Sequence, residues 1–346
     1  MPSISRKKLN YTIQPPLREY LHRYDREIVL PVSYRDLLHI SGAFPLTDRQ
    51  GRDTLWETVF YEPQTLRELS QGLAEVYALL KTAGDLSFTE HLLADRIDYC
   101  RFGNSNPFRV RIVNQLNDNY DYFYIKQADA SRVYGLELEH LLSPNRLSYL
   151  VSGDTLVEEH IAGVPGDDFI RTRLPKLQFN QVRLAKEFVK FNERCFARLL
   201  GDMRSYNYVV DITPDFEDEQ YRVRAIDFDQ QSYEGRKSMY LPQYFKDNRP
   251  VVDLCSRFLK PESIRQYQTE ERVLMLRRVR LERYRLKALM DCMRRDDLAP
   301  TEKLQQLRLE LNHHHGTTKF DHCHTMGDMV RLNLQLMLSP LDIRQR

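Results

Sequence analysis

The chain has 346 residues, of which 42% are hydrophobic and 29% are charged, a composition typical of a globular protein and not of a disordered one. Lysine and arginine (51) nearly balance aspartate and glutamate (49), so the overall charge gives no reason to expect a nucleic acid or an anionic membrane as a partner. No apolar run approaches roughly 20 residues, the length that a membrane-spanning helix needs.

The cysteines and the first residues bear on the compartment. Five cysteines are scattered along the chain and odd in number, which favours reduced thiols in a cytoplasmic protein over a disulfide framework. The stretch MPSISRKKLNY carries basic residues without an apolar core behind them, so it does not resemble a secretory signal. We therefore expect a cytoplasmic protein.

The first part of the chain gives the weakest pattern. Residues 1–62 mix prolines with short apolar runs and are expected to be irregular. Apolar residues at three- and four-residue spacing predict a helix over 65–84, with Gly84 as its stop. Ser87 and Glu90 then form a capping-box pattern, although Ser87 also fits a loop.

The pattern becomes strand-like beyond residue 100. Two strands are expected at 108–116 and 120–128, joined by an NDN turn, and a short helix is expected at 131–142. The segments RLSYLVSG and DTLVEEHIAG predict two more strands. Residues 100–162 should therefore form a small, mostly antiparallel sheet that carries one helix.

The second half is mainly helical. The strongest amphipathic pattern in the chain predicts a helix over 179–200, although Asn192 interrupts its apolar stripe. The stretches YNYVVDI and YRVRAIDF predict two strands on either side of a polar hairpin loop. Beyond residue 240 the sequence predicts mostly helices.

Four polar motifs occur in an order that is typical of a known fold. Lys126 lies on a predicted strand, and Glu137 lies on a predicted helix eleven residues later. The stretches GDMRSYN (201–207) and IDFD (226–229) come next. In this order and spacing, over about residues 100–235, the chain resembles the protein-kinase-like fold, and most closely its aminoglycoside and choline phosphotransferases.

The resemblance implies an α+β fold with two lobes. We expect an N-terminal, mainly helical extension over 1–95, packed on a small nucleotide-binding lobe with an antiparallel sheet over 96–162. A helical lobe with the catalytic loop and the metal motif would follow over 163–346. The stretch LVEEHIAGVPG (156–166) resembles the segment that links the two lobes in that family.

The resemblance also implies roles for single residues. Lys126 would contact the phosphates of ATP, and a carboxylate on the neighbouring helix would hold its amine: Glu137, with Glu139 as the alternative. Asn207 and Asp227 would supply oxygen ligands to Mg²⁺. Asp202 would orient the acceptor hydroxyl and act as the general base.

The nucleotide would make further contacts. In RFGNSNPFRV, the candidate for the loop that covers the phosphates, Gly103 and Ser105 are the expected contacts, although the stretch also fits a plain turn that opens a strand. Glu159 and Ile161, in the linking segment, complete the expected nucleotide-binding residues.

The chain departs from the family pattern in two places. Leu200 stands where the family has a histidine before Gly-Asp, and Asp229 stands where kinases have a glycine after the metal motif. Asp229 fits either a second metal contact or a turn residue. A separate His- and Cys-rich segment at 312–324 fits either a zinc site or an interhelix loop.

The predicted function is therefore ATP- and Mg²⁺-dependent transfer of a phosphoryl group to a hydroxyl. The expected acceptor is a small molecule, with a protein as the second choice; neither a nucleic acid nor a membrane is expected as a partner. Two alternatives stay open. The chain could be a catalytically inactive nucleotide-binding scaffold, or it could transfer AMP.

Overall fold

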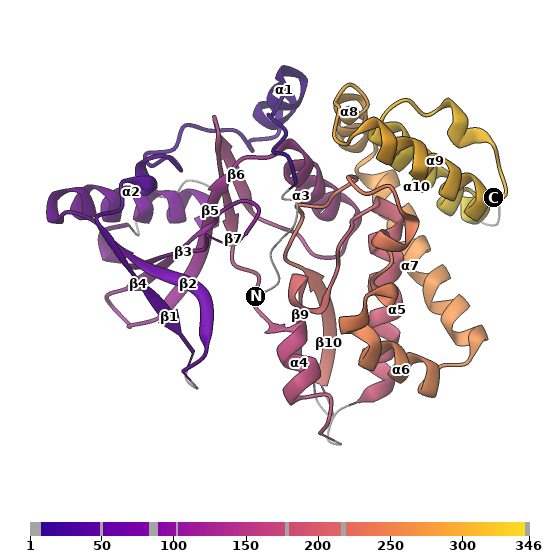
Figure 1. The fold of residues 1–346 in the computed structure, drawn as a ribbon, viewed down its shortest axis with the longest axis horizontal. Coiled ribbons are helices and arrows are strands. Elements are labelled where there is room, and N and C mark those ends of the chain that lie inside the picture. Colours follow the sequence, from indigo (N-terminus) through magenta and orange to yellow (C-terminus); the bar gives the residue numbers. More distant parts are fainter. Residues whose placement is uncertain are drawn as a thin grey trace. The chain divides into compact units, whose positions relative to one another are not determined.

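The computed structural model describes residues 8–48, 51–82, 89–101, 103–176, 180–215 and 219–342. The fold is α+β, as predicted, and its contacts divide the chain into two units (Figure 1). The first unit comprises residues 1–130 and 147–160, and the second comprises 131–146 and 161–346. Within the described ranges, no helix combines the length and the apolar character needed to cross a membrane. The domains expected from the sequence stay a prediction.

The first unit is built on a seven-stranded antiparallel sheet, in the order β1-β2-β3-β4-β5-β7-β6. Its strands are β1 (Gly42–Thr47), β2 (Asp53–Phe60), β3 (Leu92–Tyr99), β4 (Phe108–Asn114), β5 (Tyr120–Gln127), β6 (Tyr149–Ser152) and β7 (Thr155–Glu159). Two helices accompany the sheet, α1 (Pro15–Arg23) and α2 (Pro63–Thr82).

Alternation along the strands separates an apolar face of this sheet from a polar one. On β4, Phe108, Val110 and Ile112 are buried in a core that α2 covers (Figure 1). Arg109 and Arg111 point the other way, because successive side chains of a strand face opposite sides of the sheet. Arg109 Nη2 donates to Asp98 on β3 at 2.7 Å, and its guanidinium lies 4.7 Å from the ring centre of Trp56.

The prediction of a mainly helical extension was wrong for part of the N-terminal region. β1 and β2 lie in this region, and β2 pairs with β3, which was not expected as a strand either. β1 and β2 pair as a local hairpin, but no residue of β1 is buried, so its sequence lacks the apolar alternation that indicates a strand. The pairing of β2 with β3 joins residues far apart in the chain, which local propensity does not reveal. The helix expected at 65–84 is confirmed as α2, whereas its expected stop, Gly84, and the cap residue Ser87 lie outside the described residues.

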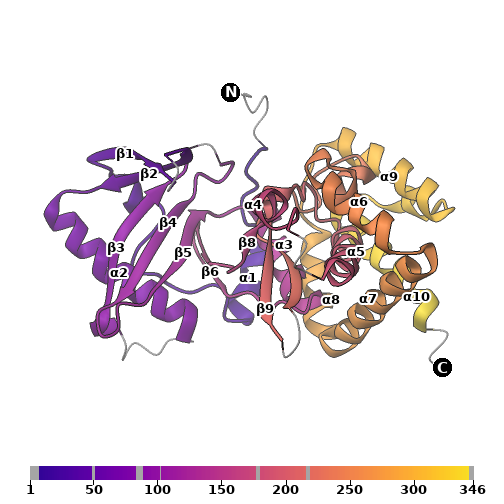
Figure 2. The same ribbon diagram turned by 90° about the horizontal axis from the view of Figure 1, so that it is seen from below.

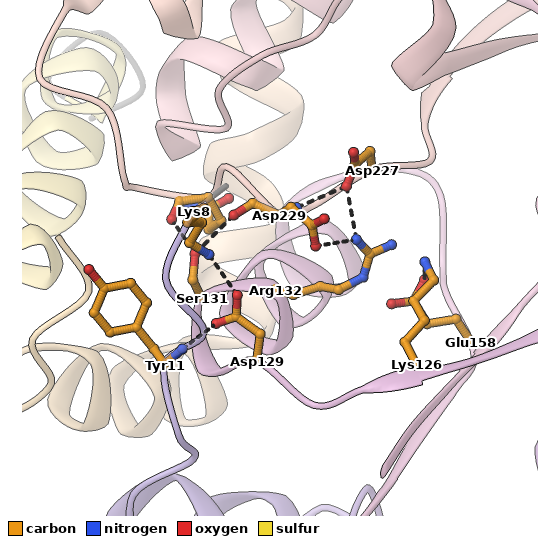
Figure 3. A network of polar contacts seen from close by, with 10 residues as sticks. Lys8, Tyr11, Lys126, Asp129, Ser131, Arg132, Glu158, Asp227 and Asp229 are labelled. Carbon is orange, nitrogen blue, oxygen red and sulfur yellow. Dashed lines mark hydrogen bonds and ion pairs between the residues drawn. The ribbon is translucent and has the colours of Figure 1, made fainter. Parts of the chain in front are cut away.

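The strands and the helix expected beyond residue 100 are confirmed. β4, β5, β6 and β7 lie where the sequence placed them, and α3 spans Ala130–Leu142. The segment before α1 is tied to the end of β5: Lys8 Nζ lies 2.7 Å from the Asp129 carboxylate, and the Ala130 amide donates to the Tyr11 carbonyl at 2.7 Å (Figure 3).

The second unit contains most of the helices and a small sheet. Its sheet has three strands in the order β10-β9-β8. The strands are β8 (Val164–Pro165), β9 (Tyr208–Pro214) and β10 (Glu219–Ala225). The helices after α3 are α4 (Gly166–Thr172), α5 (Gln181–Arg198), α6 (Arg249–Phe258), α7 (Pro261–Leu281), α8 (Arg283–Met293), α9 (Thr301–His315) and α10 (Met326–Asp342). Both the hairpin and the helices beyond residue 240 agree with the sequence-based expectation.

Helix α5 is the centre of the second unit. It packs against α6, α7, α10 and β10, as Figure 2 shows for the three helices. Its second half is buried on nearly all sides. Asn192, which interrupts the apolar stripe, is buried as well: its Oδ1 accepts a hydrogen bond from the Gln243 amide at 2.9 Å, and its Nδ2 donates to the Phe188 carbonyl at 2.8 Å.

Short 3-10 helices occur in the connections. They are η1 (Asp36–Leu38), η2 (Thr89–His91), η3 (Ser205–Asn207), η4 (Lys237–Tyr240), η5 (Pro242–Tyr244), η6 (Lys246–Asn248) and η7 (Lys319–His322). η3 and η4 belong to the loops that carry the candidate site.

Candidate functional site

Two loops of the second unit, one after α5 and one after β10, are hydrogen-bonded to each other. The Gly201 amide donates to the Gln230 carbonyl at 3.2 Å, and the Ser232 amide donates to the Leu199 carbonyl at 2.8 Å. A Cβ atom on residue 201 would lie 3.0 Å from that Gln230 oxygen, so the close approach of the two loops favours a glycine here. The motifs GDMRSYN and IDFD are therefore neighbours in space.

Asp202 has a left-handed backbone conformation, with φ at 58°. Such a conformation costs an L-residue roughly 1–2 kcal/mol, and two hydrogen bonds hold it here. The Asp202 amide donates to the Met239 carbonyl at 3.0 Å, and Asn207 Nδ2 donates to the Asp202 carbonyl at 2.7 Å. The backbone thus fixes the direction in which the carboxylate points.

The surroundings of Asp202 shift the pKa of its carboxyl group. Burial raises the pKa of its carboxyl group, and the negative charges of Asp227 and Glu234 raise it further. Arg204 opposes this rise in pKa, because its Nε donates to Asp202 Oδ1 at 3.0 Å. A perturbed carboxyl group beside a second carboxylate is typical of functional sites, although ion-pair networks produce such shifts too.

Asn207 and Asp227 come together at one end of the β9–β10 hairpin. Tyr208 and Ala225 are the last paired residues there, and the Ile226 amide donates to the Asn207 carbonyl at 3.0 Å. The hairpin therefore brings Asn207 and Asp227 to the same strand ends.

A buried arginine joins the two aspartates of IDFD. Arg132, on α3, places Nη1 at 2.8 Å from Asp227 Oδ1 and at 2.6 Å from Asp229 Oδ1 (Figure 3). The side chains of Arg132 and Asp229 are only 2% and 9% exposed, whereas that of Asp227 is 33% exposed. Asp229 is thus a buried ion-pair residue. Sequence reasoning missed Arg132, because a lone arginine on a helix carries no signal.

Lys126 has a carboxylate partner within the first unit. Its Nζ lies 2.8 Å from Glu158 Oε2, and the two side chains are 9% and 8% exposed (Figure 3). Lys126 pairs with Leu156 in the β5–β7 register, so Glu158 is its diagonal neighbour on the same face of the sheet. Sequence reasoning missed Glu158. The strand LVEE would have suggested it only if the pairing register had been known.

The two helix glutamates have arginine partners in the second unit. Glu137 is fully buried, and Arg285 Nη2 on α8 donates to it at 2.9 Å. Glu139 binds Arg198 at the end of α5. The two residues are two positions apart on α3 and so face different helices. Their role as supports of Lys126 stays a prediction, while Glu158 is the carboxylate placed beside Lys126 in its own unit.

The remaining expected nucleotide contacts lie on the first unit and at the start of the second. Gly103 belongs to the β3–β4 connection, where the Asn106 amide donates to its carbonyl at 3.3 Å; Ser105 lies in the same turn and is half-buried. Glu159 ends β7 and accepts a hydrogen bond from the Ser148 amide at 2.9 Å. Ile161 is buried in the second unit.

The histidine-rich segment packs against protein groups. His315 Nε2 lies 2.8 Å from Asn333 Oδ1, and the ring of His314 meets that of Phe196 edge-on. Over the residues that the structure describes, no group of three or more His, Cys, Asp or Glu side chains could hold a metal ion by itself. Leu200, which stands in place of the family's histidine, is fully buried and bridges to Gln231.

No protein-family model matches the sequence, and no curated protein matches it significantly. A function for this chain is therefore inferred from its residues and their geometry.

Proposed function

We propose that the chain is an ATP- and Mg²⁺-dependent phosphotransferase of the two-lobed, kinase-like type. Its acceptor is a hydroxyl group, on a small molecule in preference to a protein. One observation carries the proposal: residues from two separate motifs, Asp202 and Asn207 on one loop and Asp227 on the other, converge at the end of the β9–β10 hairpin.

The oxygen atoms at this position suit Mg²⁺. Magnesium prefers one or two carboxylates and keeps several waters, while substrate phosphates complete its shell. Asn207 Nδ2 donates a hydrogen bond to the Asp202 carbonyl, so the side-chain oxygen Oδ1 is the atom that would bind the metal ion. Asp227 Oδ1 accepts hydrogen bonds from Arg132 and from the Asp229 amide, and the Asp227 carboxylate would be the charged ligand of the metal ion. When bound, Mg²⁺ would supply positive charge to the phosphates.

Asp202 has the properties of a residue that orients the acceptor hydroxyl and removes its proton. Its carboxylate is held by Arg204 and by a fixed backbone, so it can accept a hydrogen bond from a hydroxyl and orient that oxygen for attack on phosphorus. As the new O–P bond forms and the bond to the leaving nucleotide breaks, the hydroxyl proton passes to Asp202. The pKa of Asp202 lies above its ordinary value, which makes the carboxylate a better base.

The strand order of the first unit agrees with the assignment of Lys126. In protein kinases, the phosphate-binding lysine is on the third strand of the small lobe, after a loop that covers the phosphates and before the helix with its glutamate partner. Here Lys126 is on the last strand of the β3–β4–β5 meander, and α3 follows directly. The proposal assigns Lys126 to the nucleotide phosphates, with Glu158 limiting the positions of its amine.

A second candidate, a nucleotide-binding scaffold without catalysis, is favoured by Arg132. A guanidinium group already places one positive charge against Asp227 and Asp229, where a metal ion would otherwise supply positive charge. In such a protein ATP would bind without Mg²⁺. A third candidate, transfer of AMP, keeps the same residues and differs only in the product.

Thermal unfolding of the full chain with ATP separates the first two candidates. For the phosphotransferase, ATP with Mg²⁺ stabilises the protein by about 2.7 kcal/mol at a ligand concentration of 100 Kd, and the Asp227→Asn variant loses the part that depends on Mg²⁺. Asp211→Asn, on β9 of the same unit, is the matched control. Equal stabilisation by ATP with and without Mg²⁺ would contradict the proposal and support the scaffold.

Product analysis separates phosphoryl transfer from AMP transfer. Incubation with a mixture of hydroxyl-bearing small molecules and Mg-ATP should release ADP and add one phosphoryl group to an acceptor. Release of pyrophosphate, with a nucleotide added to the acceptor, would replace the proposed reaction with AMP transfer.

A further inference from the structure

An apolar pocket lies among the helices α7, α8 and α10, far along the sequence from the proposed catalytic loops. The three helices contact one another pairwise within the second unit (Figure 2). The pocket has a volume of about 350 Å³, within the range of roughly 300–1,000 Å³ that is usual for small-molecule sites.

The walls of this pocket are aliphatic. Leu276 comes from α7, Leu286 and Met290 from α8, and Leu334 and Leu338 from α10. Each of these residues is buried, so the walls belong to the packed core. A wall of this kind recognises hydrocarbon and offers no partner to a polar group.

The rim of the pocket carries positive charge. Three cations, Arg283, Lys287 and Arg331, and one carboxylate, Asp291, line it. Lys287 and Arg331 form no ion pair over the ranges that the structure describes, and both are exposed. Arg283 lies over the ring of its neighbour Tyr284, at 4.4 Å from the ring centre.

We propose that this pocket binds a medium-chain carboxylic acid, an unbranched hydrocarbon tail with a single anionic head. The tail lies between α7, α8 and α10, and the carboxylate lies at the rim beside Arg331 and Lys287. The apolar walls favour a hydrocarbon tail. At the rim the cationic side chains outnumber the single carboxylate, so the rim favours an anionic head group over a neutral or a cationic one. The proposal is independent of phosphoryl transfer.

The length of the tail gives the first test. Binding of hexanoate, octanoate and decanoate to the full chain is measured by isothermal titration calorimetry. Burial of each additional methylene contributes about 0.8 kcal/mol, so the dissociation constant should fall roughly fourfold for each one that enters. Equal affinities along the series, or the absence of saturable binding, would overturn the proposal.

The charge of the head gives the second test. Decanol has the same tail without the anion and should bind more weakly than decanoate. The Arg331→Glu variant should weaken decanoate binding roughly threefold to tenfold, because an attraction is replaced by a repulsion. Arg277→Glu, an exposed position on α7 that does not line the pocket, should bind decanoate as the unchanged protein does. If decanol binds as tightly as decanoate, the proposed selection of an anion is wrong.

The third test fills the pocket with a bulky side chain. It can still refute the proposal if a variant at the rim misfolds. Val279→Trp adds bulk at a partly exposed position of the lining and should abolish decanoate binding. Val273→Trp, on the same helix but outside the lining, is its control. Unchanged binding in Val279→Trp would place the ligand elsewhere.

Gel filtration tests whether a second copy of the chain covers this surface instead. If the unchanged protein binds no decanoate and Arg331→Glu converts an oligomer to a monomer, the surface is an interface between copies of the chain.

Discussion

Arg132 Nη1 lies 2.8 Å from Asp227 Oδ1, so a permanent cation from α3 contacts the carboxylate to which the sequence assigned a metal. The same nitrogen atom lies 2.6 Å from Asp229 Oδ1. Without this guanidinium, the two aspartates would lose the cation that both of them contact. Arg132 therefore holds the IDFD loop together whether or not a metal ion is bound.

Replacement of Arg132 by methionine should destabilise the protein by about 3–5 kcal/mol, the usual cost of removing one partner of a buried ion pair. Saturating Mg²⁺ should recover part of this loss, because a divalent cation can replace the missing charge beside Asp227. Urea unfolding with and without Mg²⁺ measures both quantities. Arg132→Lys keeps the charge and should be milder. A loss that Mg²⁺ leaves unchanged would show that no metal ion reaches Asp227.

Replacement of Asp202 by asparagine should stabilise the protein at neutral pH while it lowers phosphoryl transfer roughly 10²–10⁴-fold. The folded-state pKa of Asp202 is raised above the ordinary value of 3.8, so the folded protein binds this proton more tightly than the unfolded chain does. The ionised carboxylate therefore lowers stability at every pH above the raised pKa.

The gain in stability of the Asp202→Asn variant should depend on pH, because it comes from the ionised carboxylate that the variant lacks. It should be complete at pH 7, decrease as the pH falls through the raised pKa of Asp202, and vanish below 3.8. Melting temperatures of the variant and of the unchanged protein, compared over pH 3–8, test this. Asp211→Asn, whose carboxylate is outside the site, serves as the control. A difference that grows toward acid pH would have the wrong sign.

Lys126 and Glu158 should behave as a coupled pair. Replacing either residue alone removes one member of a buried ion pair and should cost about 3–5 kcal/mol. The double change, Lys126→Met with Glu158→Leu, should cost less than the sum of the two. Denaturant unfolding of the double-mutant cycle gives the coupling energy. Binding of ATP should be lost in every variant that lacks the lysine, including the stable double variant. Strict additivity of the two changes would contradict the coupling.

Gly201→Ala should disturb the contact between the two loops of the site. The added methyl group would lie 3.0 Å from a backbone oxygen of Gln230, which cannot move as a flexible side chain could. We expect a destabilisation of about 1–3 kcal/mol and a lower rate of transfer at unchanged ATP affinity. Gly42→Ala, with no atom within 4 Å of the added group, is the control and should be close to neutral. An active, fully stable variant would show that the loops can separate without consequence.

Local pattern was a good guide wherever a segment's own residues decide its structure. The helix α5 has an apolar stripe of its own, and the hairpin of β9 and β10 has a polar loop between two alternating strands, so both were predicted. β1, β2 and β3 were not predicted. No residue of β1 is buried, so its hairpin with β2 has little apolar alternation, and the pairing of β2 with β3 joins residues far apart in the chain. Motif spacing likewise brought attention to Asp202, Asn207 and Asp227.

The sequence by itself determined the α+β class, the main helices and the pair of strands whose ends carry Asn207 and Asp227. Only the tertiary structure decided which charges meet: Arg132 with Asp227 and Asp229, Glu158 with Lys126, and Arg285 with Glu137. Secondary structure follows from neighbours along the chain, whose spacing can be read directly. An ion pair between residues 95 or 148 positions apart depends on packing and pairing register, which the order of residues does not reveal.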